Sequence, residues 1–167
     1  QMDKPFNDYG GSSESIPPSL FTKDNVETYK RAQDVMNKYA DGWRPKNLFL
    51  YATFREAAST SNEGSLELAK YVKEKIGKQF DINKGSHWTE TPLHLAVVHN
   101  NKAMQEWLLK HQYIDVNDVN YERQTPLHLA KTSDSVKALL SSEKIEVNKQ
   151  DERGNTPLHL AAARGNI

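Results

Sequence analysis

The six residues Thr-Pro-Leu-His-Leu-Ala, TPLHLA, occupy positions 91–96 and recur at 125–130 and 156–161. A second phrase follows the same register, with FDIN at 80–83, IDVN at 114–117 and IEVN at 145–148. In both series the copies lie 34 and 31 residues apart. Two different phrases with the same spacing indicate an internal repeat, and such a period is typical of a repeat architecture.

Each TPLHLA phrase has the chemistry of a helix start. Its threonine hydroxyl can cap the first turn, and the proline that follows stands where a missing N–H costs nothing. After the first copy, Asn100 can adopt the left-handed conformation that ends a helix, and Asn101 can cap a second helix. Met104, Trp107 and Leu108 then recur at helical spacing. We therefore predict helix–turn–helix units, each followed by an extended hairpin.

This unit resembles the ankyrin repeat, whose period is about 33 residues, and the resemblance is close over residues 80–167. It implies an all-α solenoid with short β-hairpins and a helical N-terminal cap. In ankyrin repeats the histidine of TPLH hydrogen-bonds the threonine and nearby backbone groups, so the resemblance implies a structural role for His94, His128 and His159. A shared metal site is disfavoured, because equivalent positions of stacked repeats lie about one helix diameter, ~10 Å, apart.

The sequence departs from the ankyrin pattern in two places. The second repeat is three residues shorter between TPLHLA and its next helix, so its first helix or the following turn must be clipped. The hairpin glycine of the family matches Gly154, whereas Thr89 and Arg123 stand at the equivalent positions. Since a non-glycine residue with positive φ costs roughly 1 kcal/mol, we expect these two hairpins to bend differently.

The N-terminal region is predicted to form an arm and a cap. Residues 1–19 are rich in Gly, Ser and Pro and show no periodicity, which predicts a flexible arm. Residues 20–46 are predicted to form a capping helix, over 23–40, and a turn. Because a terminal repeat has an open face, an atypical cap is expected there. Most aromatic residues precede residue 55, and they can form the core of this cap or a docking site for a partner.

Residues 47–84 are predicted to form a degenerate first repeat. Its first helix, over 47–58, is apolar almost all round, and its second helix covers 66–76. The segment ends in FDIN, as the later repeats end in related phrases. The other boundaries give a full repeat at 85–118, a shortened repeat at 119–149 and a truncated repeat at 150–167.

The composition disfavours several classes of function. The 22 Lys and Arg balance 22 Asp and Glu, with no basic block to bind nucleic acid. There is no cysteine, and no apolar run approaches the ~18 residues of a membrane span. DVNDVN at 115–120 lacks the ligand order and glycine of a calcium loop. With no disulfide framework and no membrane span, we predict a cytoplasmic protein. Because the sequence contains no catalytic motif, we predict that it is not an enzyme and needs no cofactor or metal.

The resemblance implies a protein–protein interaction module that binds another protein through its concave surface of hairpins and inner helices. The predicted partner-binding residues lie at the hairpin tips: His87, Trp88, Tyr121, Glu122, Glu152 and Arg153. Trp88 and Tyr121 are of types enriched among binding hot spots, although Trp88 can instead fold back over the N-terminal repeat. The alternatives are a substrate-recruiting N-terminal part of a larger enzyme and a bacterial effector delivered into host cells.

The resemblance also implies a modification. The asparagine of the VN phrase in ankyrin proteins is a target of asparaginyl hydroxylation in animal cells, and Asn117 and Asn148 match it best, with Asn83 a weaker match. The alternative is that these asparagines only hydrogen-bond the loop into the hairpin.

The last repeat is expected to be incomplete. The final stretch TPLHLAAARGNI, residues 156–167, supplies one helix and a glycine turn, and then ends where a second helix should begin. We therefore expect the chain to be a fragment with a bare apolar face. Another molecule is expected to cover that face, and a second copy could do so through an end-to-end contact.

Overall fold

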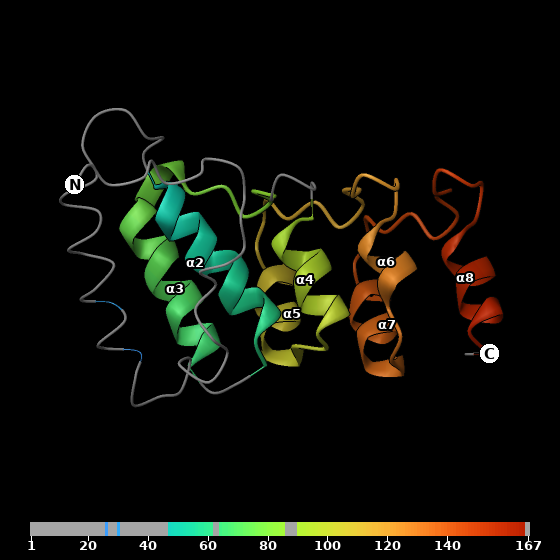
Figure 1. The fold of residues 1–167 in the computed structure, drawn as a ribbon, viewed down its shortest axis with the longest axis horizontal. Helices are drawn as coiled ribbons and strands as arrows, with labels where there is room; N and C mark the ends of the chain where they lie inside the picture. Colours follow the sequence, from blue (N-terminus) through green and yellow to red (C-terminus); the bar gives the residue numbers. More distant parts are fainter. Residues whose placement is uncertain (1–25, 27–29, 31–46, 62–63, 86–89, 166–167) are drawn as a thin grey trace, which may run out of the picture.

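The computed structural model describes residues 26, 30, 47–61, 64–85 and 90–165, and these residues form a stack of helix pairs (Figure 1). The inner row consists of α2 (Leu48–Ser59), α4 (Pro92–Val98), α6 (Pro126–Leu129) and α8 (Pro157–Ala163). The outer row consists of α3 (Ser65–Ile76), α5 (Lys102–Leu109) and α7 (Ser133–Leu140), with a 3-10 turn, η3 (Gly77–Gln79), after α3. Each helix packs on its partner in the pair or on the neighbouring helix of its own row. The predicted all-α solenoid is confirmed.

The starts of the inner helices follow from the threonine–proline chemistry. At α4, the His94 backbone N–H donates to the Thr91 hydroxyl, and the Thr91 backbone N–H donates to Nδ1 of the His94 ring. The same reciprocal box forms between Thr156 and His159 at α8. Because two otherwise unpaired donors are satisfied at once, each helix begins at a fixed residue.

The turn between α4 and α5 confirms two predictions made from asparagine. Asn100 has a φ of 51°, which places it in the left-handed region and ends α4. The Asn101 side chain accepts from the Met104 N–H at 3.2 Å and so caps α5. Its amide also donates to the Thr60 carbonyl at 2.7 Å, which ties α5 to the end of α2.

The clipped repeat loses its missing residues from the inner helix. Where α4 and α8 have seven residues, α6 has four, and the chain is already extended at Ala130. A helix this short leaves carbonyl groups without intrahelical partners. One of them, the carbonyl of His128, accepts a hydrogen bond from the Arg164 guanidinium at 3.0 Å. The following repeat therefore satisfies a group that the shortened helix leaves open.

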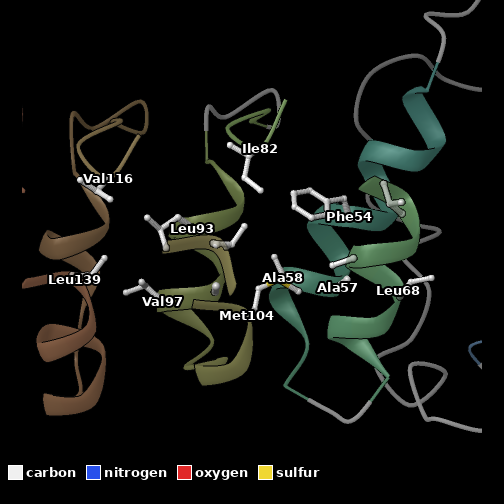
Figure 2. Packing of buried hydrophobic residues seen from close by; sticks show 14 of the residues in the cluster. Phe54, Ala57, Ala58, Leu68, Ile82, Leu93, Val97, Met104, Val116 and Leu139 are labelled. Atoms are coloured by element: carbon white, nitrogen blue, oxygen red, sulfur yellow. The ribbon is translucent and has the colours of Figure 1, made fainter. Parts of the chain in front are cut away.

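The core lies between the two rows and continues from one pair to the next (Figure 2). Phe54 is fully buried and meets Phe80 edge to face, with ring centroids 5.1 Å apart. Ile82 of FDIN and Val116 of IDVN are buried as well, whereas Val147 of IEVN is 45% exposed. Residues that occupy equivalent places in the repeats thus differ in burial, because each depends on the helix pair that follows.

Most of the predicted N-terminal arm and cap lies outside the described residues. Val26 and Lys30, which are described, are both helical, and Val26 is buried. The Lys30 ammonium lies 2.9 Å from a carboxylate oxygen of Glu67 on α3. The predicted helices over 47–58 and 66–76 correspond to α2 and α3, and the division of the chain into repeats at residues 84, 118 and 149 stays a prediction. Among the described helices, none has the length and apolar character required to cross a bilayer.

Candidate partner-binding surface

The hairpin tips are built on two equivalent polar residues, Asn120 and Asp151. Oδ1 of Asn120 accepts the backbone N–H groups of Glu122 and Gln124 at 3.0 and 2.9 Å. Oδ1 of Asp151 accepts the N–H groups two and four residues further on at 2.9 and 2.8 Å. Since a side chain holds the backbone of each turn, the tip side chains project from a fixed frame.

The two described hairpins bend in the same way, so the expected difference at Arg123 is wrong. Arg123 has a φ of 59°, and Gly154 at the equivalent position has a φ of 79°. The N–H of each donates to the carbonyl three residues earlier, at 2.9 and 3.0 Å. The two N–H bonds to Asn120 Oδ1 hold the turn closed. Arg123 therefore adopts the strained positive φ that this turn requires. Thr89, the third equivalent position, lies outside the described residues.

The tips of the two hairpins join into one strip. The backbone N–H of Glu152 donates to the carbonyl of Glu122 at 3.0 Å. Tyr121 is 63% exposed, and its hydroxyl donates to the Glu122 carboxylate at 3.1 Å. This hydrogen bond and the charge of Glu122 raise the pKa of Tyr121. Glu152 and Arg153 are also exposed. His87 and Trp88 lie outside the described residues.

Two of the TPLH histidines, His94 and His128, connect an inner helix to the next hairpin. Nε2 of His94 donates to the carbonyl of Gln124, and Nε2 of His128 donates to the carbonyl of Asn155, both at 2.9 Å. Because Nδ1 of His94 accepts the Thr91 N–H, the His94 ring is neutral with its proton on Nε2. Burial lowers the pKa of His94, although its bond to the Gln124 carbonyl acts in the opposite direction. The predicted bonds to threonine and backbone are confirmed.

The asparagines of the VN phrases form a second set of connections. The amide of Asn83 donates to the Tyr113 carbonyl at 2.8 Å, and its Oδ1 accepts the Asp115 N–H at 2.9 Å. Asn117 makes the same pair of bonds with the next loop, to the carbonyl of residue 144 and the N–H of residue 146. Asn148 is exposed and has no hydrogen-bond partner among the described residues.

These connections show what the sequence interpretation missed. We expected these asparagines to hydrogen-bond the loop into the hairpin, whereas Asn83 and Asn117 each bond across to the following repeat. The sequence contained one signal for these contacts, the common spacing of the TPLHLA and VN phrases. Contacts that join successive repeats recur at the period of the repeat, so the residues that make them recur at that period too. Spacing alone does not show which repeat receives the bond.

Comparison with family models identifies this architecture. A model described as "Ankyrin repeats (3 copies)" matches residues 55–151, which is more than half of the chain, and one described as "Ankyrin repeat" matches residues 153–167. The chain belongs to the ankyrin repeat family. No curated protein matches it. Ankyrin repeats are generally protein–protein interaction modules, and they are typically non-catalytic.

The outer row of this ankyrin array carries two grooves that sequence reasoning did not find. The first outer groove lies between α3 and α5, and it is lined by Lys70, Lys73, Glu74, Gly77, Lys78 and Trp107. The second outer groove lies between α5 and α7, and its charged lining residues are Lys102, Glu106, Asp134 and Lys137. A signal for the first groove was present in the sequence, because Lys70 and Lys73 lie three residues apart and therefore on one face of α3.

Proposed function

We propose that this ankyrin array binds a partner protein through the hairpin strip, the tip residues 120–124 and 151–155, together with the adjoining inner helices. The observation that carries the proposal is the exposure of Tyr121 on a backbone fixed by side-chain hydrogen bonds. An exposed aromatic side chain on a rigid turn loses little conformational entropy on binding, which favours its use as an anchor.

The charges of the strip add specificity to this anchor. Glu122, Glu152 and Arg153 lie close enough to Tyr121 for their charges to act on its pKa, and Arg123 is exposed on the same strip, so a complementary partner presents both basic and acidic groups. His87 and Trp88 extend the proposed surface by sequence position alone.

The predicted cytoplasmic location is part of this proposal. No described residue favours a catalytic or effector role, and neither is proposed.

The test begins by placing a photo-crosslinking amino acid at Tyr121 and identifying the attached protein by mass spectrometry. Titration calorimetry with that purified partner then compares Tyr121→Ala with Tyr113→Ala. Both residues are tyrosines and both are largely exposed, at 63% and 71%, but Tyr113 follows the outer helix α5. We expect Tyr121→Ala to weaken binding by about 2 kcal/mol, as at a hot spot, and Tyr113→Ala to leave it unchanged. Equal affinities for both variants and the wild-type chain would refute this surface.

A further inference from the structure

The two outer grooves differ in charge although they occupy equivalent places in successive repeat junctions. The first outer groove holds three lysines and one glutamate among its lining residues, a net charge of +2. The second holds two lysines, one glutamate and one aspartate, a net charge of zero. Since the whole chain has 22 basic and 22 acidic residues, the first groove is a local segregation of positive charge.

The lysines of the first outer groove are available to an anionic ligand. In the part of the chain that the structure describes, Lys70 and Lys78 take part in no ion pair. Lys73 lies over the ring of Trp107, with its ammonium 5.7 Å from the ring centroid. In the second groove, by contrast, Lys102 lies 3.8 Å from a carboxylate oxygen of Asp134. Neighbouring acidic groups therefore neutralise the second groove but leave the first one positive.

The first outer groove also has an apolar wall. Trp107 is half-buried, and its ring meets the buried ring of Phe54 at a centroid distance of 6.1 Å. The groove is shallow and largely open to solvent, with a volume of about 540 Å³, so it suits an extended segment better than an enclosed small molecule. A tryptophan held in place by the core, with lysines around it, can contact an apolar group while the ammonium groups contact carboxylates.

We propose that the first outer groove docks an acidic segment of a partner protein. Carboxylates of the segment contact Lys70, Lys73 and Lys78, and one apolar side chain of the segment packs against Trp107. This surface belongs to the outer row, so it is separate from the hairpin strip on the inner side, and the array can engage two partner segments at once.

The probe for this proposal is a fluorescein-labelled peptide with a leucine at its centre and glutamates on both sides. Its binding to the full chain is measured by fluorescence anisotropy at physiological ionic strength, where exposed charges more than ~8 Å apart are largely screened. We expect Lys70→Glu/Lys78→Glu to weaken binding at least about tenfold. The matched control, Lys102→Glu/Lys137→Glu, makes the same charge change in the second groove and is expected to alter binding less than about twofold.

Two further readouts locate the peptide. Addition of the peptide is expected to shift the indole N–H resonance of Trp107, and Tyr121→Ala is expected to leave peptide binding intact.

Circular dichroism establishes that each variant is folded. The variant Lys70→Gln/Lys78→Gln removes charge without reversing it, and it is expected to weaken peptide binding to an intermediate extent.

Several results would overturn the proposal. These are no binding to the wild-type chain, equal weakening by the variants of the two grooves, and an unmoved Trp107 resonance. Binding to anionic phospholipid vesicles with the same lysine dependence, in the absence of peptide binding, would also overturn it in favour of a membrane surface. Loss of peptide binding in Tyr121→Ala would place the peptide on the hairpin strip instead.

Discussion

The full repeat of α4 and α5 and the clipped repeat of α6 and α7 begin alike and end differently. In both, the TPLH histidine donates to the next hairpin at 2.9 Å. The inner helix then continues for seven residues in one case and four in the other. The histidine contacts that join these repeats to the next hairpin lie at the starts of the inner helices, so a repeat can lose most of a turn at the other end and keep them.

The largest expected effect comes from removing a joining histidine. His94→Ala leaves the buried Thr91 N–H without a partner, removes one of the two donors to the Gln124 carbonyl and opens a cavity, so we expect it to lower the free energy of unfolding by about 3 kcal/mol. The control is His159→Ala, at an exposed histidine that bonds only within its own repeat, for which we expect about 1 kcal/mol or less. Urea denaturation followed by circular dichroism measures both values, and similar losses would contradict the joining role.

A change of pH tests the same histidine without mutation. Because burial lowers the pKa of His94 in the folded chain, the unfolded chain binds more protons once the pH falls below the reference value of about 6.5. The stability contribution of neutral His94 is therefore complete above about pH 6.5. It is lost as the pH falls towards the folded pKa, by at most ~1.4 kcal/mol per pH unit. Urea midpoints between neutral and mildly acidic pH should show this decline, and His94→Ala should flatten it.

The clipped repeat is expected to depend on Arg164 in a way that the full repeat does not. Arg164→Ala removes the donor to the His128 carbonyl, and because this contact is partly exposed we expect a loss of about 1 kcal/mol. Arg153→Ala, at an exposed arginine of the hairpin tip, serves as the control and should change stability by less than about 0.5 kcal/mol. Hydrogen exchange should then show faster opening of α6 in Arg164→Ala alone.

Substitutions at the equivalent turn residues of the two hairpins should give effects of opposite sign. Gly154 has a φ of 79° with no atom near an added Cβ, so Gly154→Ala introduces only backbone strain and should cost about 1 kcal/mol. Arg123→Gly relieves the strain at a φ of 59°, partly offset by the freedom of glycine in the unfolded chain, and should stabilise by about 0.5 kcal/mol. Thermal melts of the two variants measure both effects, and destabilisation by Arg123→Gly would show that its side chain contributes to the fold.

The predicted hydroxylation should distinguish the two asparagines by rate rather than by stability. We propose that Asn148 of this 167-residue chain is modified faster than Asn117, because both polar atoms of the Asn117 amide are bonded to the next loop. A hydroxylase must break these bonds before it can bind the segment. Mass spectrometry after treatment with an asparaginyl hydroxylase measures the addition of one oxygen atom at each site. Faster modification of Asn117 would refute the ordering.

The sequence by itself determined the repeat, the helix starts and the turn that joins α4 to α5. These features depend on local chemistry: threonine followed by proline begins a helix, and Asn100 followed by Asn101 ends one helix and caps the next. The loss of three residues after the second TPLHLA was also visible, since residues can be counted between two phrases, but the sequence left open whether the helix or the turn is shorter.

Only the tertiary structure decided what each repeat does for its neighbour. Arg123 adopts a positive φ because side-chain bonds from Asn120 hold its hairpin closed, which local propensity opposes. The direction of the Asn117 amide bonds and the positive groove beside Trp107 depend on residues of two repeats brought together by stacking. A sequence pattern specifies the repeat, whereas the contacts between repeats depend on distances that arise only when the repeats pack.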